Sequence, residues 1–408
     1  MRKSQVKAML FGLLNAILML ALCLYWLSLP RTFGDEAFFI QWTSLVKKSL
    51  FGFDEKPDPN SVFYVDISGS KTLIEKEDPF YQEKTGYQFQ SITNREDLAN
   101  FLQYIRTYGK DIPIVILDIT FQHSSPADSL LQAAIDSFPF PLAGASALSP
   151  EGEVEKSKIK LPTGIASYFS PNAQFLKYPL YIQDSLPTLP LVALGLSQQK
   201  PYYKKGIWPR IDGKVNLINP IIDFKIRTID LTYGESVKPG KYTIRSLGTL
   251  LYEWEFWDAA DIRQLLDHKT IIVGDFHYDN HQTIYGIMPG PVIVHNTYLT
   301  LEDGGSEVRW LWILWLFFLF FWMSRRIYLE EEAGIRSKWW RRSKTAVGKI
   351  IADSIDDSFF LIIGTIFSYL VFNIHINILI LLVYLKIVAF ILKRFVFKHP
   401  AKIFSNNI

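Results

Sequence analysis

The stretch Thr270–Leu301, TIIVGDFHYDNHQTIYGIMPGPVIVHNTYLTL, decides the fold. It opens with the β-branched apolar run Thr270–Val273, which stops at the turn signal Gly274-Asp275, as a short buried strand does. A polar loop rich in His, Asp and Asn follows, and Met288-Pro289-Gly290-Pro291 then opens a helical stretch. One segment therefore supplies a core strand, a polar loop at the end of that strand, and a helix. That helix leads on to an apolar segment that begins at Trp310.

The chain before this stretch alternates between predicted strands and helices. Val62–Val65 and Ile112–Leu117 are apolar runs typical of buried strands, and Pro139–Ala145 is a candidate third strand. Helices are predicted at Arg95–Tyr108, capped by the preceding asparagine, and from Ser125-Pro126 onward. This order is the pattern of a mostly parallel sheet flanked by helices, so the predicted fold class is α/β.

The other segments of this region carry weaker signals. Lys71–Gln88 is polar and irregular, and we predict an excursion without regular structure. For the middle of the chain we predict a helix, two short strands and a helix capped by Asp258: Ser185–Gln198, Val215–Ile218, Phe224–Leu231 and Ile262–Leu266.

Apolar segments near both ends of the chain predict a protein with four membrane spans. The first, 8–29, follows the basic residues of 1–7 and has the roughly 20 residues that cross a bilayer. It lacks a small-residue cleavage site, which favours an uncleaved signal anchor over a cleaved signal peptide. Three further spans are predicted at 308–324, 359–374 and 376–392. The helical pattern of Phe38–Phe51 is interpreted as an extension of the first span.

The distribution of basic residues predicts the orientation of the chain. The loop 325–358 and the tail 393–408 are rich in Lys and Arg, so the positive-inside rule places both in the cytoplasm with the N-terminus. The segment 30–307 then forms one large domain outside. The predicted location is the bacterial inner membrane, with this domain in the periplasm.

Composition excludes several other classes. The net charge is only +3 and no basic stripe is interleaved with aromatic residues, so nucleic acid is not an expected partner. The single cysteine, Cys23, allows neither an intrachain disulfide nor a cysteine metal site. The hydrophobic share of 49% and the aromatic share of 15% fit a protein in contact with a bilayer.

Three predicted strands end in carboxylates. The carboxyl ends of adjacent parallel strands meet in one crevice, which is the usual ligand position of such sheets. The candidate ligand-binding residues are the strand-end carboxylates and the polar side chains that follow the last strand: Asp66, Asp118, Asp275, His277, Asp279 and His281. These residue types would also suit a divalent metal, the one cofactor considered. The alternative is that each strand-end Asp only caps the next turn.

No paired nucleophile and acid can be assigned, so an enzyme is not expected. The closing motif instead resembles that of the second class of CHASE domains, which are bacterial sensory domains outside the inner membrane. The resemblance covers Phe33 to Leu301 and rests on the residues Val273-Gly274, His281, Thr283, Met288-Pro289-Gly290, His295-Asn296, Val62–Asp66, Ile114–Phe121, Asp128 and Leu130-Leu131. The family's segment after the first strand is represented here only by diverged residues at 66–70 and 90–95.

The resemblance implies a membrane sensor that binds an unknown small-molecule or protein ligand outside the cell. Only 393–408 follow the last predicted span, so we expect the signal to pass to a separate cytoplasmic or membrane effector. The candidate relay residues are Pro289, Gly290, His295 and Asn296. Two alternatives remain open: a membrane-anchored periplasmic metal-dependent hydrolase, and a structural docking subunit of a membrane complex.

Overall fold

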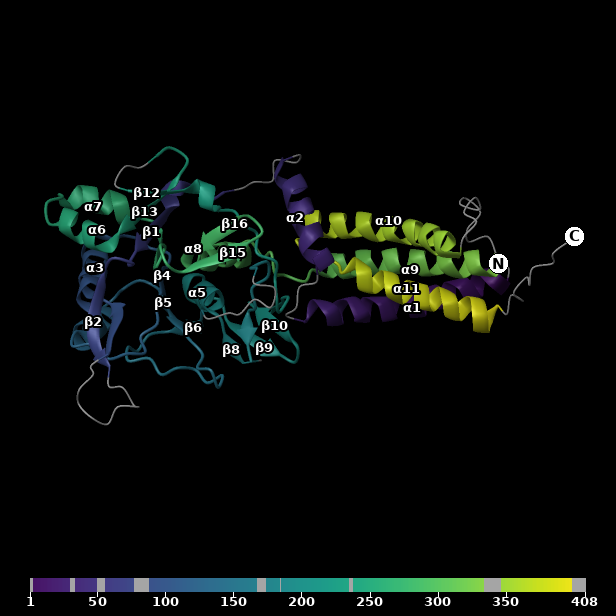
Figure 1. Ribbon diagram of the computed structural model, residues 1–408, viewed down its shortest axis with the longest axis horizontal. Helices are drawn as coiled ribbons and strands as arrows, with labels where there is room; N and C mark the ends of the chain where they lie inside the picture. Colours follow the sequence, from purple (N-terminus) through teal and green to yellow (C-terminus); the bar gives the residue numbers. More distant parts are fainter. Residues whose placement is uncertain are drawn as a thin grey trace, which may run out of the picture. The chain divides into compact units, whose positions relative to one another are not determined.

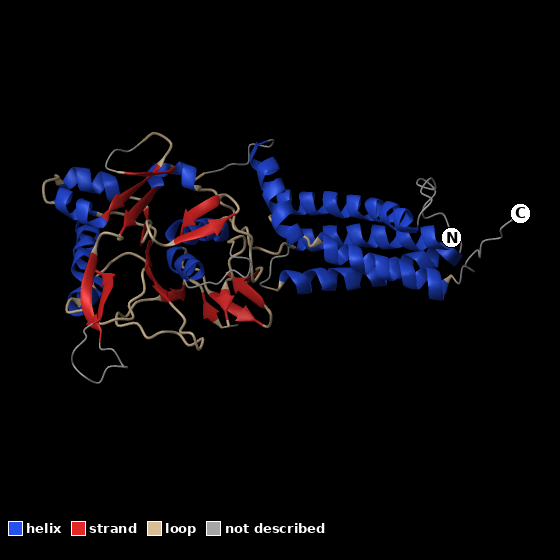
Figure 2. Cartoon of the chain, in the orientation of Figure 1, coloured by secondary structure: helices blue, strands red, loops and turns tan. Residues whose placement is uncertain are grey.

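The structure, a computed structural model, describes residues 3–29, 34–49, 56–76, 88–166, 174–183, 185–234, 238–333 and 346–397 (Figures 1 and 2). The chain divides into two compact units. The first, called here the α/β unit, consists of Asp54–Asn216 and Ile222–Gly305. The second, called the helical unit, consists of Met1–Phe53, Leu217–Ile221 and Ser306–Ile408.

The α/β unit is built on a seven-stranded sheet in the order β12-β13-β1-β14-β4-β5-β6. Every neighbouring pair is parallel. The predicted fold class, a mostly parallel sheet flanked by helices, is therefore confirmed for this unit. The strands are β1 (Val62–Asp66), β4 (Val115–Asp118), β5 (Leu142–Ser146), β6 (Thr163–Ile165), β12 (Leu231–Tyr233), β13 (Tyr242–Ser246) and β14 (Thr270–Gly274).

Strand β14 occupies the centre of this sheet, between β1 and β4. Its residues Ile271, Ile272 and Val273 are fully buried, because helices cover both faces of the sheet. The continuous apolar run at the start of the decisive stretch is thus the middle strand of the core. The predicted β1 is also confirmed, whereas β4 begins later than predicted, after Pro113.

One face of the sheet carries four helices. They are α3 (Arg95–Tyr108), α4 (Asp128–Asp136), α6 (Leu247–Trp254) and α7 (Ala259–Leu266). Their apolar side chains form one core with alternate strand residues, including Val65, Leu117 and Val273. The predicted caps are confirmed: the side chain of Asn94 accepts backbone hydrogen bonds at the start of α3, and that of Asp258 does so at the start of α7.

The opposite face carries α5 (Leu189–Ser197) and α8 (Gly290–Glu302), which pack on each other (Figure 1). Residues Gly290 to Leu301 of α8 are all buried, so this helix is enclosed on every side. Helix α8 directly follows the hairpin after β14. The decisive stretch therefore supplies both the central strand and the central helix of this face.

Two predictions for the α/β unit are wrong. The predicted excursion Lys71–Gln88 begins with β2 (Lys71–Lys76), which pairs antiparallel with β3 (Gln88–Thr93), and 77–87 lie outside the described residues. Among the described strands, β2 pairs only with β3 and is not part of the buried sheet, so it needs no apolar run, and its sequence therefore carries no strand signal. The predicted strand Phe224–Leu231 is instead a 3-10 turn, η2 (Thr228–Asp230), leading into β12, because the side chain of Asn296 binds the backbone that a strand would pair.

Several small elements complete this unit. The predicted strand at Val215–Ile218 is reduced to the last strand of a three-stranded antiparallel sheet, and the predicted helix Ser185–Gln198 is confirmed only as the shorter α5. The remaining elements here are η1 (Pro59–Ser61), β7 (Tyr181–Ile182), β8 (Leu186–Pro187), β9 (Tyr202–Lys205), β10 (Trp208–Ile211) and β11 (Lys214–Val215).

In the described part of the helical unit, the long helices run side by side and a further helix, α2, lies at one end of them (Figures 1 and 2). The helices are α1 (Lys3–Leu27), α2 (Gly34–Ser49), α9 (Trp310–Ala333), α10 (Ala346–Phe372) and α11 (Ile378–Ile391), which ends in the π-helical turn η3 (Leu392–Val396). Because α1 ends at Leu27, α2 is a separate helix and not an extension of the first span.

Two helices among the described residues are long and apolar enough to cross a membrane, Ser4–Leu27 and Trp310–Glu330. The prediction of four spans is corrected accordingly. The apolar part of α10, Ser358–Phe372, is shorter, and α11 has only 14 residues. The described parts of the predicted loop 325–358 are helical, because α9 continues to Ala333 and α10 begins at Ala346, and 334–345 lie outside the described residues. Charge alone does not end a helix, and the ion pair of Arg326 with Glu330 supports the extension of α9.

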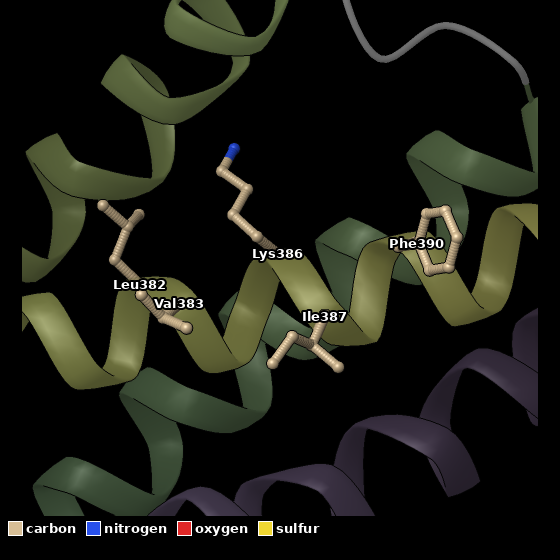
Figure 3. Close-up of a pocket in the computed structure, with 5 residues that line it drawn as sticks. All are labelled: Leu382, Val383, Lys386, Ile387 and Phe390. Atoms are coloured by element: carbon tan, nitrogen blue, oxygen red, sulfur yellow. The ribbon is translucent and has the colours of Figure 1, made fainter.

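One side of α11 borders an open groove with a volume of about 350 Å³ (Figure 3). Four apolar residues and one lysine form its wall: Leu382, Val383, Lys386, Ile387 and Phe390. The long aliphatic stem of Lys386 makes this wall largely apolar.

Candidate functional site

The carboxyl ends of the three central strands lie level with one another. Asp66 of β1 pairs in register with Gly274 of β14, and Gly274 pairs with Asp118 of β4. Asp275 follows directly. The strand ends singled out in the sequence thus meet at one edge of the sheet, which is where open α/β sheets bind ligands.

Two of the three strand-end carboxylates are engaged in turns. Asp66 Oδ1 accepts hydrogen bonds from the backbone N–H groups of Ser68 and Phe276, both at 3.0 Å. Asp275 Oδ1 accepts from the N–H groups of His277 and Tyr278 at 3.1 and 2.8 Å. These are the contacts of carboxylates that cap turns. Lys71 Nζ lies 3.4 Å from the other oxygen of Asp275.

Asp118 is the strand-end carboxylate in a different environment. It is partly buried on the sheet face that α8 covers, and a Cβ added at Gly274 would lie 3.2 Å from the Cβ of Asp118. Burial, and to a lesser degree the nearby carboxylate of Asp279, raise the pKa of Asp118 to about 7, and His281 opposes the rise. A carboxyl with such a pKa exchanges a proton near neutral pH.

A short hairpin brings Asp279 and His281 to this edge. It consists of β15 (Asn280–Thr283) and β16 (Gly286–Pro289). The turn between them ends at Gly286, whose positive φ of 95° suits a tight turn. The sequence predicted only a polar loop here. His281 Nε2 lies 2.8 Å from Asp279 Oδ1, and this hydrogen bond is the main cause of a raised His281 pKa, although burial opposes it.

The first residue of α8, Gly290, contacts Asp279. The N–H of Gly290 donates to the backbone oxygen of Asp279 at 2.7 Å. A Cβ at this position would collide with Asp279 Oδ2, so only glycine allows the approach. The ring of Phe175 meets His281 edge-on, with ring centroids 5.0 Å apart. Backbone and aromatic contacts thus hold the Asp279–His281 pair in place.

Two of the four relay candidates, His295 and Asn296, lie apart from this edge. His295 is buried, its Nδ1 lies 2.7 Å from the hydroxyl of Tyr64 on β1, and burial lowers its pKa to about 3. Asn296 is fully buried and binds both the N–H and the C=O of Ile226. Pro289 is the N-cap of α8 and Gly290 its first residue. His295 and Asn296 therefore anchor α8 to its surroundings.

The six ligand-binding candidates thus divide into three groups. Asp118, Asp279 and His281 interact electrostatically with one another, Asp66 and Asp275 serve turns, and His277 is solvent-exposed. Within the described ranges, no group of three or more His, Cys, Asp or Glu side chains is placed to hold a metal ion.

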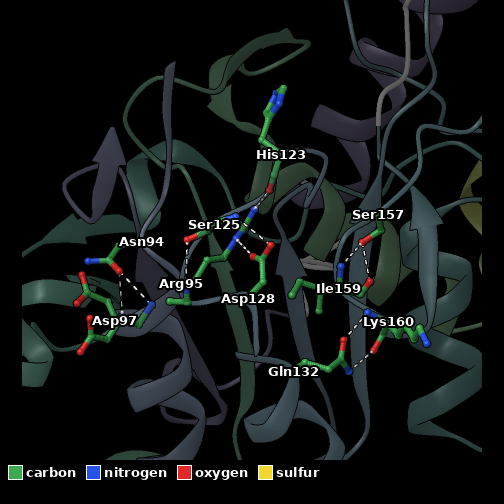
Figure 4. A network of polar contacts seen from close by, with 12 residues as sticks. Asn94, Arg95, Asp97, His123, Ser125, Asp128, Gln132, Ser157, Ile159 and Lys160 are labelled. Atoms are coloured by element: carbon green, nitrogen blue, oxygen red, sulfur yellow. Dashed lines mark hydrogen bonds and ion pairs between the residues drawn. The ribbon is translucent and has the colours of Figure 1, made fainter. Parts of the chain in front are cut away.

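A buried arginine near the same edge was missed in the sequence. Arg95 is 1% exposed, and its guanidinium stacks 4.4 Å from the ring of Phe121. It lies 3.4 Å from Asp128 Oδ1 and donates to the backbone oxygen of His123 at 3.3 Å (Figure 4). Burial lowers the pKa of Arg95, and Asp128 opposes this. Arg95 joins α3 to α4 and to the loop after β4. Its partners Asp128 and His123 are distant in sequence, so no local pattern predicts these contacts.

Replacing Asp279 with asparagine should lower the pKa of His281, because the charged partner that favours the imidazolium is lost. The test is the pH dependence of diethylpyrocarbonate modification, which reports neutral histidine, read by mass spectrometry on the full-length protein. The half-point for His281 should shift to lower pH. The exposed His277 is the internal control, and an equal shift of both residues would contradict a specific Asp279–His281 contact.

The chemistry available at this edge is proton exchange by Asp118 and the binding of hydrogen-bond donors or positive charge by two carboxylates beside an imidazole. No family model, no curated protein and no solved structure matches this chain.

Proposed function

We propose that this chain is an integral membrane, receptor-like protein. Its α/β unit binds a ligand outside the cytoplasmic membrane, and its helical unit relays binding to a separate partner. The observation that carries this is the position of Asp118, at the carboxyl end of a central parallel strand and beside the Asp279–His281 pair. Its carboxylate is not committed to a turn as those of Asp66 and Asp275 are.

The environment of Asp118 favours a ligand with hydrogen-bond donors or a positive charge. Burial and the neighbouring carboxylate of Asp279 make the ionised form of Asp118 unfavourable, which is why its pKa lies near neutral pH. A donor or cationic group between Asp118 and Asp279 would stabilise that ionised form. Such a ligand is a small molecule or the side chain of a protein partner, and it would bind more tightly above pH 7, where Asp118 ionises.

The chain order provides a route from this site to the membrane. Helix α8 begins at the site with Pro289 and Gly290, carries His295 and Asn296, and is followed by α9 after Asp303–Arg309. In the proposed topology α1 and α9 span the inner membrane, the α/β unit between them lies outside, and both termini are cytoplasmic. The resemblance to the second class of CHASE domains agrees with this role.

A melting experiment on the full-length protein in detergent tests the ligand site. The probe is the dialysable small-molecule fraction of the source cells. We expect it to raise the melting temperature of the wild type but not of Asp118→Ala or His281→Ala. His277→Ala is the matched control, since this exposed histidine lies in the same loop, and it should respond like the wild type. No rise in the wild type, or the same rise in all four proteins, would contradict a small-molecule site here.

The relay is tested by purification from native membranes in a mild detergent. A near-stoichiometric partner with an enzymatic domain is the expected result. Recovery of the protein alone would remove the outlet for the signal and leave a binding or docking role.

A further inference from the structure

Three helices of the helical unit meet at one buried amide. Asn15 of α1 is 4% exposed, and its Nδ2 donates to Ser324 Oγ of α9 at 2.8 Å. The hydroxyl of Tyr384 on α11 donates to Asn15 Oδ1 at 2.6 Å. The hydroxyl of Ser324 also donates to Phe320 O of its own helix at 2.7 Å. Both ends of the amide are therefore used, each by a different helix.

These polar groups lie in segments that are otherwise almost entirely apolar. A buried polar group in such a setting costs free energy unless it has a partner, so the helices are favoured only in arrangements that keep these bonds. A single buried asparagine is known to select one register between packed helices for this reason.

The contacts of α1 and α9 define that register. The ring centroids of Phe11 and Tyr328 are 5.3 Å apart, and four residues further along α1, Asn15 meets Ser324, four residues earlier on α9. The two helices are therefore antiparallel. They approach closely at Gly12, where a Cβ would lie 3.1 Å from the ring of Phe321. A slide by one residue or a rotation of either helix would break the Asn15 contacts.

We propose that Asn15, Ser324 and Tyr384 form a latch that holds α1, α9 and α11 in one relative depth and rotation. Under the proposed receptor function, on which this part of the inference rests, α9 can turn or slide in response to ligand only when the latch opens. The latch is tested in the resting protein without ligand. A negative cross-linking result would therefore contradict the latch alone, and a negative ligand-binding result would contradict the receptor function alone.

The single native cysteine offers a direct test. Two further steps of four residues from the Asn15–Ser324 pair place Cys23 of α1 level with Leu316 of α9, and both are buried. Full-length Leu316→Cys in its membranes should form a Cys23 disulfide rapidly on oxidation with copper phenanthroline. Disulfides demand close, aligned backbones, so the rate reports the population of the latched register.

Adding Asn15→Leu to Leu316→Cys should slow this cross-linking by up to about eightfold. Two interhelical hydrogen bonds of about 0.6 kcal/mol each correspond to that factor in the equilibrium between the latched and open registers. Tyr384→Phe, which removes only one hydroxyl, should slow it less and guards against a folding defect of the first variant. Leu14→Ala is the matched control, because Leu14 of α1 is 63% exposed, and it should leave the rate unchanged.

A second cysteine position checks the geometry. Phe318 of α9 is 62% exposed and lies off the α1 contact, so Phe318→Cys should cross-link slowly in every background. Unchanged rates in both Asn15→Leu and Tyr384→Phe would overturn the latch, as would rapid cross-linking at position 318.

Discussion

Replacing Asp118 with asparagine should stabilise the α/β unit at pH 8 and leave its stability at pH 4 almost unchanged. The folded pKa of this carboxyl is about 7, against an ordinary value of 3.8. Between these two pH values the folded protein holds a proton that the unfolded chain has released. The free energy of unfolding therefore falls as the pH rises from about 4 to about 7, and Asp118→Asn removes that loss.

The full difference between these pKa values corresponds to about 4 kcal/mol. Because Asp118 is partly exposed, we expect roughly half of this, about 2 kcal/mol at pH 8. Denaturant unfolding of the full-length protein in detergent at the two pH values measures it. His281 also has a raised pKa, and its contribution is lost as pH rises through that value, so the variant keeps some pH dependence above 6.5.

Asp111→Asn is the matched control for this experiment. Its carboxylate is 64% exposed, and asparagine tolerates the positive φ of 49° at this position as well as aspartate does. The control should show the wild-type difference between pH 4 and pH 8. If Asp118→Asn were less stable than the wild type at pH 8, the ionised carboxylate would be stabilising the folded protein. That result would contradict a raised pKa of Asp118 and the binding site proposed from it.

Replacing Asn296 with leucine should lower the free energy of unfolding of the α/β unit by about 3 kcal/mol. The amide binds the N–H and the C=O of Ile226, at 2.9 and 2.8 Å, and both backbone groups are buried. Leucine has a similar volume but leaves these two groups without partners, at a cost of about 1–3 kcal/mol each. Pulse proteolysis of the full-length protein across a urea series measures the loss.

Thr297→Val is the control that separates this effect from general disturbance of α8. Thr297 is equally buried, but its hydroxyl bonds only Ile293 O of its own helix. We expect a loss of less than about 1 kcal/mol, because valine keeps the shape and no other backbone group is orphaned. Equal losses in the two variants would show that the helix, and not the Ile226 contact, determines the cost.

The parts of the fold that the sequence predicted are those with local signals. The apolar run Thr270–Val273, the N-cap at Asn94 and the alternation of strands and helices were sufficient for the α/β class and for the shared edge of Asp66 and Asp118. The order of the strands in the sheet could not be predicted from the sequence. The place of β14 between β1 and β4 depends on pairing between distant segments, which no local periodicity encodes.

The candidate site shows the same division. Residue types and positions identified Asp118, Asp279 and His281. They did not show which carboxylates would accept hydrogen bonds within turns. That depends on the backbone of Ser68 and Phe276 for Asp66, and on the turn after β14 for Asp275. Among the described residues, fewer helices than predicted are long enough to cross a membrane, because an apolar run does not fix the length of its helix and α11 is only 14 residues long.

The central position of β14 has a consequence for synthesis of the protein. Strands β1 and β4 leave the ribosome well before Thr270–Gly274, yet they are joined only through β14. Until then the nascent unit has two open strand edges in the middle of its sheet, which are prone to wrong pairing. Formation of the sheet is therefore a single late event, governed by long-range contacts and correspondingly slow. A chain interrupted before Thr270 would be an unfinished sheet and a substrate for proteases rather than a smaller working domain.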